Sequence, residues 1–383
     1  MLRKTLFATL CASVLLGSAL PVSAAGEQSF PSEQGTLSLT PLVQGLNHPW
    51  ALAFLPDRQG MLVTERPGSL RVVSPDGKLS APLNGVPKVW ANGQGGLLDV
   101  VLSPDFKQDR LVYLSYAEGG GENGTAGTAV GRGRLADDLS GLKDFKVIFR
   151  QEPKLSTGNH FGSRLVFDRD GYLFITLGEN NNRATAQDLD KLQGKIVRLY
   201  ADGRVPDDNP FVGQPGVRPE IWSYGHRNPQ GATLNPWSGT LWENEHGPKG
   251  GDEINLIERA KNYGWPLATH GVNYSGQPIP EAGGQTAPGT VGPHHVWEKS
   301  PGISGMAFYD GDRFKPWQHN LFIGALASRE LIRLQFDGDR VTHEERLLGD
   351  LNARIRDVRQ GPDGYLYILT DEDQGGLYKV GLE

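Results

Sequence analysis

Arg164-Leu-Val-Phe167, Asp170-Gly171 and Tyr172-Leu-Phe-Ile-Thr176 form a short apolar strand, a tight turn and a second strand. A third strand signal follows at Lys195-Ile-Val-Arg-Leu199. Apolar residues that alternate with period two and are joined by Asp-Gly are typical of antiparallel hairpins. This stretch therefore predicts an antiparallel sheet made of consecutive strands, and it sets the pattern for the rest of the chain.

The same strand-turn-strand unit is found six times. The copies begin near Trp50, Leu97, Arg164, Gly231, Gly305 and Ile355. This series predicts an all-β fold, a six-bladed β-propeller of four-stranded antiparallel blades, because a ring of blades leaves few sheet edges open. The segment Leu37-Ser-Leu-Thr40 is expected to join the last strands and close the ring. A pair of β-sandwiches is the alternative.

The N-terminus has the pattern of a secretory signal peptide. Residues 1–25 carry two basic residues, an apolar run from Leu6 to Leu20 and a small-residue cleavage site. The run is shorter than the roughly 18 apolar residues that a membrane span needs. The mature chain is therefore expected to be residues 26–383, a single propeller domain with a loop insertion at about 258–300, and to be periplasmic or secreted.

The composition excludes several function classes. The single cysteine, Cys11, lies in the expected signal peptide, so the mature chain has neither disulfides nor thiol chemistry. Without the two basic residues of that peptide, 36 of the 38 Lys and Arg remain against 44 acidic residues, a net charge of about −8. This charge argues against a nucleic-acid partner, and no later segment has the length of a membrane span. We expect a monomer or a weak dimer.

His160 stands directly before the inner strand of the third copy, in Asn159-His-Phe-Gly162. Its imidazole would face the central channel, where a group that titrates near neutrality can accept a proton from a substrate hydroxyl. A structural histidine is the alternative. Polar residues in equivalent places favour the base, since Gln94 and the run from Arg227 to Gln230 also precede inner strands.

Arg354 and Arg356 flank Ile355 at the start of the sixth copy, so both are expected to face one way. Two adjacent guanidinium groups repel each other unless an anion or a planar acid lies between them. The pair therefore predicts an anionic ligand in an axial pocket. A surface pair balanced by Asp350 and Asp357 is the alternative.

Gly247-Pro248, Asp252-Glu253 and Tyr263 bring backbone and side-chain oxygens close together in sequence. Carbonyl and carboxylate oxygens of this kind suit Ca²⁺. The spacing is not that of an EF-hand, and a solvated acidic turn is the alternative. The histidines show no zinc spacing, and no phosphate-binding or dinucleotide-binding fingerprint follows a suitable strand.

Taken in order, these motifs resemble the soluble pyrroloquinoline quinone (PQQ)-dependent aldose sugar dehydrogenases of the glucose/sorbosone dehydrogenase family. The resemblance extends over nearly the whole mature chain. It rests on Gly93-Gln94-Gly-Gly-Leu-Leu98, Asn159-His160-Phe-Gly-Ser-Arg164, Gly225-His-Arg-Asn-Pro-Gln230, Glu245-His-Gly-Pro248, Gly251-Asp-Glu-Ile-Asn255, Asn262-Tyr-Gly-Trp-Pro266 and Arg354-Ile-Arg-Asp357. Each motif alone is weak, whereas the ordered set is specific.

The resemblance implies oxidation of an aldose sugar at its anomeric carbon to the lactone, with hydride transfer to PQQ and electrons passed to an external acceptor. It implies that His160 is the catalytic base and that Ca²⁺ accompanies the cofactor. The implied cofactor contacts are Gln94, Arg227, Asn228, Tyr274, Arg354 and Arg356. The implied Ca²⁺ contacts are Gly247, Pro248, Glu253 and Tyr263.

The chain departs from the family pattern in one place. Related enzymes often carry a lysine after the strand equivalent to Leu321–Gly324, where this chain reads Ala325-Leu-Ala-Ser-Arg329. Either Arg329 replaces that lysine or a cofactor carboxylate loses a partner. Two other functions remain open, a calcium-dependent lactonase-type propeller and a non-catalytic sugar-binding propeller. The lactonase would need acids at the inner-strand starts, where this chain has arginines.

Overall fold

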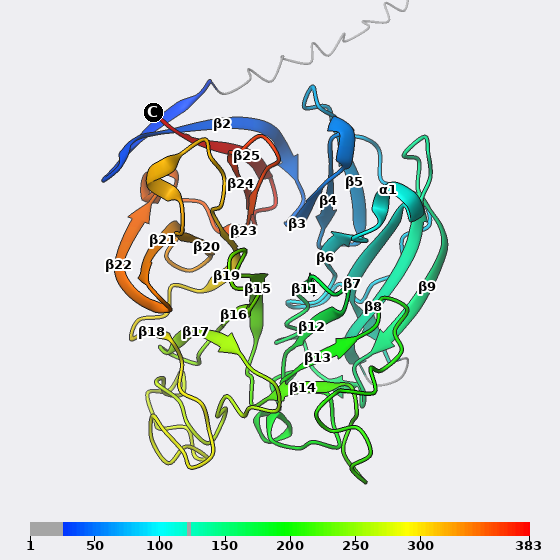
Figure 1. The fold of residues 1–383 in the computed structure, drawn as a ribbon, viewed down its shortest axis with the longest axis vertical. Helices are drawn as coiled ribbons and strands as arrows, with labels where there is room; N and C mark the ends of the chain where they lie inside the picture. The colour runs from blue at the N-terminus through cyan, green and yellow to red at the C-terminus, as the bar shows by residue number, and fades with distance from the viewer. Residues whose placement is uncertain (1–25, 121–123) are drawn as a thin grey trace, which may run out of the picture.

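Six antiparallel sheets surround a central axis (Figure 1). The computed structural model describes residues 26–120 and 124–383, so the expected signal peptide, residues 1–25, lies outside the described part. The predicted six-bladed β-propeller is confirmed. Within the described residues no helix has the length and apolar character needed to cross a membrane.

Each sheet is one blade, numbered here in chain order, and its first strand lies innermost. Blade 1 contains β3 (Pro49–Phe54), β4 (Met61–Glu65) and β5 (Ser69–Val73). Blade 2 contains β6 (Leu97–Leu102), β7 (Leu111–Gly119), β8 (Thr125–Leu135), β9 (Leu142–Arg150) and β10 (Leu155–Ser156). Blade 3 contains β11 (Leu165–Phe167), β12 (Leu173–Leu177), β13 (Lys195–Leu199) and β14 (Ile221–Tyr224).

Blade 4 contains β15 (Pro229–Leu234), β16 (Leu241–Glu245), β17 (Asp252–Ile257) and β18 (His295–Trp297). Blade 5 contains β19 (Ile303–Phe308), β20 (Leu321–Ala325), β21 (Glu330–Asp337) and β22 (Arg340–Leu347). Blade 6 contains β23 (Ile355–Gln360), β24 (Leu366–Thr370), β25 (Gly375–Leu382), β2 (Gly35–Leu46) and β1 (Gln28–Ser32).

The two ends of the chain close the ring in blade 6. Strand β2 pairs antiparallel with β25, with Leu37 opposite Leu382 and Thr40 opposite Lys379. Figure 1 shows the blue β2 running beside the red β25. The expected closure by residues 37–40 is therefore confirmed, and the pairing covers edges that would otherwise stay open.

Three blades have the four predicted strands, and the others vary around that number. Blade 1 has three strands and blade 6 gains β1 as a fifth. In blade 2, the nine-residue β9 and the two-residue β10 both pair with β8, so they share the outermost position. The variation is confined to outer strands and leaves the inner ring intact.

The core is divided among the interfaces between neighbouring blades. For example, Leu62 of blade 1 and Leu114 of blade 2 are fully buried in one apolar cluster, and Leu165 of blade 3 packs with Tyr113 of blade 2 in the next. Middle strands are packed on both faces of their sheets, so β4, β12 and β20 are buried at every position.

The loops carry little regular structure. The helices described are short: α1 (Phe106–Asp109), η1 (Pro56–Arg58), η3 (Arg183–Ala186), η4 (Lys315–Trp317) and η5 (Gly349–Leu351). Two long excursions, residues 180–194 and 258–294, contact each other. The carboxamides of Gln187 and Asn262 exchange two hydrogen bonds of 2.9 and 2.8 Å. The two loops therefore lie at the same end of the propeller.

Candidate active site

Bulges at the starts of inner strands turn side chains toward the central axis. The pairing register shifts between Pro49 and Ala51 in β3, between Pro229 and Gly231 in β15, and between Ile355 and Asp357 in β23. A bulge bends its strand and redirects the extra residue. The three extra residues meet: the Arg356 guanidinium donates to Gln230 at 2.7 Å and lies 5.7 Å from the ring of Trp50.

A cavity of about 660 Å³ opens above these residues. Six of the predicted site residues line it, namely Gln94, Gly247, Pro248, Tyr274, Arg354 and Arg356. Its wall also carries two lysines, Lys249 and Lys299. Tyr274 stands at the rim with 75% of its surface exposed. The cavity thus brings together groups from blades 2, 4 and 6 and gives them a basic character.

His160 lies beside this cavity, tied to it through Gln94. The Gln94 side-chain oxygen accepts the backbone N–H of His160 at 2.8 Å, and the imidazole Nδ1 lies 2.7 Å from Glu179 Oε1. Because Nδ1–H donates a hydrogen bond to the carboxylate, the lone pair of Nε2 is free to accept a proton. Burial lowers the pKa of His160, the neighbouring Arg227 lowers it further, and Glu179 opposes both. The ring is therefore neutral near pH 7.

The backbone around His160 is held in a left-handed conformation, with φ of 55°. Asn180 donates to the His160 carbonyl twice, from its backbone N–H at 3.2 Å and from Nδ2 at 3.1 Å. Gly178 packs so closely that a Cβ there would lie 1.9 Å from the same carbonyl oxygen. Strained backbone held by several groups is typical of functional sites.

Arg227 and Asn228 form a clamp held from below by Glu245. The Glu245 carboxylate accepts both backbone N–H groups of the clamp, that of Asn228 at 3.2 Å. The Arg227 guanidinium donates to the carbonyls of His246 at 3.0 Å and Gly247 at 2.7 Å. Arg227 Nε and Asn228 Nδ2 are buried donors that have no acceptor in the described residues.

Unpaired buried donors cost free energy unless a ligand supplies acceptors. The clamp donors, the basic cavity and the arginine pair therefore fit a planar polyanion such as PQQ. The Gly247 and Pro248 backbone reaches the same cavity and fits the expected carbonyl ligands of a cation. Asp252 holds this turn, since its carboxylate accepts the N–H groups of Gly247 at 3.0 Å and Gly302 at 2.7 Å.

Arg354 and Arg356 both face the cavity, and an acid that sequence reasoning missed lies between them. Asp371 accepts from Arg356 Nε at 3.1 Å and lies 4.0 Å from Arg354 NH2. His48 contacts the other Asp371 oxygen at 2.7 Å. The sequence suggested Asp350 and Asp357 as the acids that neutralise Arg354 and Arg356. Asp371 takes that place, and Asp357 pairs with Arg164 and Arg359 instead.

Glu253 and Tyr263 line a second, small cavity of about 50 Å³, separate from the first. Asp252 and Glu253 are consecutive in β17 and so point to opposite faces of the sheet. Burial, with the charge of nearby Glu245, raises the pKa of Glu253 well above its usual value. A partly buried carboxylate with a raised pKa fits the expected Ca²⁺, because a cation would stabilise its charged form.

Arg329 does not replace the family lysine. Its guanidinium donates to the backbone carbonyl of Asn352 at 3.0 Å and is absent from the cavity wall. In its region the wall is made by Leu326 and Ala327, which sequence reasoning did not single out. The Leu326 carbonyl accepts from Arg354 at 3.2 Å, so this segment still supports the arginine pair.

Glu179, Glu245 and Asp371 share a signal that could have been found in the sequence. Each lies at or just after the end of the second strand of its blade, where it contacts the start of the inner strand. Acids at the repeated position would have suggested partners for His160, the clamp and Arg356.

The chain matches the model of the Glucose / Sorbosone dehydrogenase family over residues 46–379. It is 63% identical over 345 residues to aldose sugar dehydrogenase YliI of Escherichia coli strain K12. The aligned region covers 90% of this chain and 93% of that protein.

Solved structures agree. The apo-form soluble aldose sugar dehydrogenase of Escherichia coli superposes with a TM-score of 0.89 at 63% identity, covering 91% of this chain and 100% of that one. The PQQ-bound aldose sugar dehydrogenase of Streptomyces coelicolor superposes with a TM-score of 0.74 at 28% identity, covering 92% and 100%. The chain therefore belongs to the glucose/sorbosone dehydrogenase family, which confirms the resemblance and the expected enzyme class, a sugar dehydrogenase.

Proposed function

We propose that this chain oxidises aldose sugars at the anomeric carbon to the lactone, with PQQ and Ca²⁺ as cofactors and His160 as general base. One observation carries the proposal. His160 has Nδ1 bound to Glu179 beside a basic cavity, and the adjacent clamp, which reaches the cavity wall through the Gly247 carbonyl, has two buried donors without acceptors. The PQQ named in the Streptomyces coelicolor structure supports the choice of cofactor.

His160 has the properties that the base needs. Its lowered pKa keeps the ring neutral, so Nε2 is able to take the proton of the anomeric hydroxyl as the hydride leaves. Glu179 then stabilises the imidazolium at 2.7 Å. When bound, PQQ supplies the hydride acceptor and Ca²⁺ supplies Lewis-acid charge beside it.

The remaining predicted residues would bind and orient the cofactor. Arg227, Asn228, Arg354 and Arg356 would donate to its oxygens, and Gln94 would join the cofactor site to the backbone of His160. Gly247 and Pro248 would offer carbonyls to its Ca²⁺. Glu253 and Tyr263 would hold a Ca²⁺ in the second cavity, with a structural role. Export, a sugar substrate and an external electron acceptor are part of the same proposal.

Reconstitution tests this function. The mature protein with Ca²⁺ and PQQ is expected to reduce an artificial dye when an aldose is added. His160→Ala is expected to lose most turnover while it still binds PQQ. Failure of a broad panel of aldoses to reduce the dye would refute the proposal. Lactone hydrolysis without quinone would favour the lactonase, and the absence of any spectral change with PQQ and Ca²⁺ would favour a binding propeller.

A further inference from the structure

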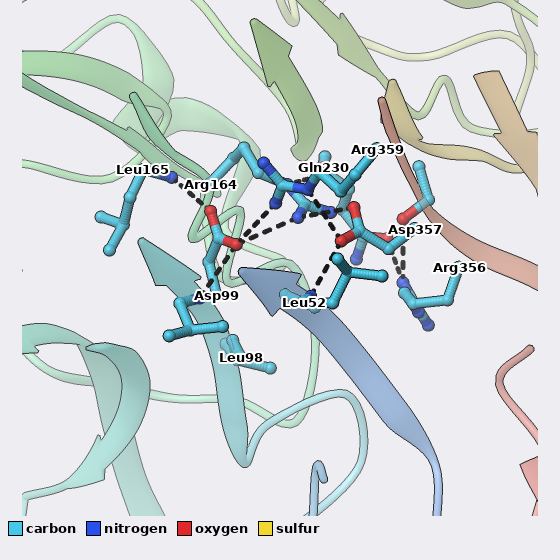
Figure 2. A network of polar contacts seen from close by, with 12 residues as sticks. Leu52, Leu98, Asp99, Arg164, Leu165, Gln230, Arg356, Asp357 and Arg359 are labelled. Carbon is cyan, nitrogen blue, oxygen red and sulfur yellow. Dashed lines mark hydrogen bonds and ion pairs between the residues drawn. The ribbon is translucent and has the colours of Figure 1, made fainter. Parts of the chain in front are cut away.

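The charged side chains that cross the central channel below the cavity balance one another (Figure 2). Arg164 donates to Asp99 at 3.2 Å and to Asp357 at 3.0 Å. Arg359 donates to the same two carboxylates, each at 2.9 Å. Two positive and two negative charges therefore cancel, and this network presents no net charge to a molecule that enters the cavity from outside.

The wall of the cavity carries basic groups that are not balanced in this way. Lys249 and Lys299 line the cavity, and both are exposed. Among residues 26–120 and 124–383, neither lysine side chain has an ion-pair or hydrogen-bond partner. Arg354 lines the same wall with 38% of its side chain exposed. Against these three basic groups, which we call the basic mouth, the wall exposes one acid, Glu298.

The backbone holds the two lysines on adjoining segments. Lys249 and Val272 exchange two backbone hydrogen bonds, of 2.9 and 3.1 Å, which attach Lys249 to the long insertion. A Cβ added to Gly250 would lie 2.4 Å from the carbonyl oxygen of Glu298. The residue after Lys249 therefore packs against the residue before Lys299, and the two lysines flank the same part of the cavity.

The basic mouth attracts anions although the chain as a whole is acidic. The sequence has 38 lysines and arginines against 44 acidic residues. Charges on a protein surface are screened over about 8 Å at physiological ionic strength, so an ion at the opening responds mainly to the mouth. Clefts lined by one sign of charge raise the local concentration of ions of the opposite sign. A neutral aldose gains nothing from this field, whereas an anionic reactant does.

A second reactant has to reach the reduced cofactor in every turnover. Oxidation of an aldose to its lactone releases two electrons and two protons, and the electrons leave the quinone before the next sugar is oxidised. An external one-electron acceptor removes them in two steps. Two acceptor molecules are therefore reduced for each sugar, and the two protons pass to water.

We propose that the basic mouth is the docking place of a small anionic electron acceptor, which Lys249 and Lys299 attract to the cavity. The inference rests on the proposed function, because the reduced quinone supplies the electrons. A small acceptor is favoured over an acidic protein because the unpaired lysines line a cavity of about 660 Å³, which is the size of a small-molecule site.

Two acceptors of opposite charge test the proposal in the enzyme loaded with PQQ and Ca²⁺. Ferricyanide is a trianion, and phenazine methosulfate supplies a cation. The kcat/KM for ferricyanide is expected to fall as salt is added, because screening weakens its attraction to the mouth. In the double variant Lys249→Glu, Lys299→Glu it is expected to be about tenfold lower than in the wild type at low salt. The kcat/KM for the cation is expected not to fall.

The matched control is the double variant Lys143→Glu, Lys146→Glu. It changes the net charge equally at two exposed positions of β9, and no residue of β9 lines the cavity. The Tm and the affinity for PQQ are measured for each protein. An equal loss of ferricyanide turnover in the control would overturn the inference, because net charge would then be the cause. Weaker PQQ binding confined to the mouth variant would also overturn it, because the lysines would then hold the cofactor.

A binding measurement gives a readout that does not depend on turnover. Hexacyanocobaltate has the charge and shape of ferricyanide but is not reduced under these conditions, and its binding to the loaded enzyme is measured by calorimetry. It is expected to bind the wild type more tightly than the mouth variant, and to compete with ferricyanide but not with the aldose. Equal binding to the two proteins would overturn the inference.

The two acceptors also separate this inference from the proposed function. Failure of the wild type to reduce either acceptor with any aldose would refute the proposed function, and the role of the mouth with it. Turnover with the cation, together with ferricyanide kinetics that are the same in the wild type and the mouth variant, would refute only the role of the mouth.

Discussion

Replacing Glu179 with Gln tests the catalytic pair directly. The substitution keeps the size of the side chain and an oxygen that can still accept from His160 Nδ1, but it removes the negative charge 2.7 Å from the ring. That charge matters only when the imidazolium forms. A hydrogen bond to a charged group contributes about 1.5–3 kcal/mol, so kcat is expected to fall roughly 10- to 150-fold. The affinity for PQQ should stay unchanged.

The pH profile gives the same variant a second readout. Glu179 raises the pKa of His160 against the effect of burial, so removing its charge lowers that pKa further. The base works when it is neutral, and the acid limb of kcat/KM should therefore move to lower pH.

Dye reduction over a range of pH, with a PQQ titration alongside, measures both effects. Glu298→Gln is the matched control, since it removes an acid from the cavity wall without touching His160. An unchanged kcat in Glu179→Gln, or an equal loss in the control, would refute the assigned role.

Three further predictions concern stability. Lys195→Met should lower the free energy of unfolding by about 1–3 kcal/mol in urea denaturation, because the buried ammonium donates to the carbonyls of Thr185, Ala186 and Gln193. Burial lowers the pKa of Lys195 from 10.5 to about 7. Between these two pH values the unfolded chain binds a proton that the folded protein does not, so the stability of the wild type should rise relative to the variant as the pH rises. A difference in stability between the two proteins that does not change with pH would contradict this. Asp357→Asn should lower the free energy of unfolding by about 3–5 kcal/mol, because the buried Arg164 and the partly exposed Arg359 lose a shared carboxylate, and a Tm within a degree of wild type would contradict it. Ca²⁺ should raise the Tm and a chelator lower it, and Glu253→Gln should abolish that shift; a shift that survives would place the ion elsewhere.

The fold could be predicted because its repeats are local. The six strand-turn-strand units, and the pairing of residues 37–40 with the last strand, follow from alternation and turn chemistry within short segments. The number of strands in each blade could not be predicted equally well from the sequence. In blade 2 a long strand, β9, and a two-residue strand, β10, share the outermost position beside β8, and nothing in the alternation of apolar residues marks that division.

The candidate site could be predicted only in part. Gln94, Arg227 and Arg356 precede or begin inner strands, so blade symmetry places them near one axis. The partners of these residues were hidden because they come from distant segments: His48 and Asp371, which hold Arg356, are 323 residues apart in sequence. Gln230 belongs to a run that the sequence places before an inner strand, but the bulge that turns its side chain onto the cavity floor is not revealed by simple alternation.

Reduction of bound quinone by a sugar tests the central claim most directly. The wild-type protein, loaded with Ca²⁺ and PQQ, is mixed with an aldose and the absorbance spectrum of the cofactor is followed, with His160→Ala measured in parallel. The account predicts that both proteins bind PQQ and that only the wild type reduces it rapidly. Rapid reduction by His160→Ala, or an unchanged quinone spectrum in the wild type with every aldose, would contradict it.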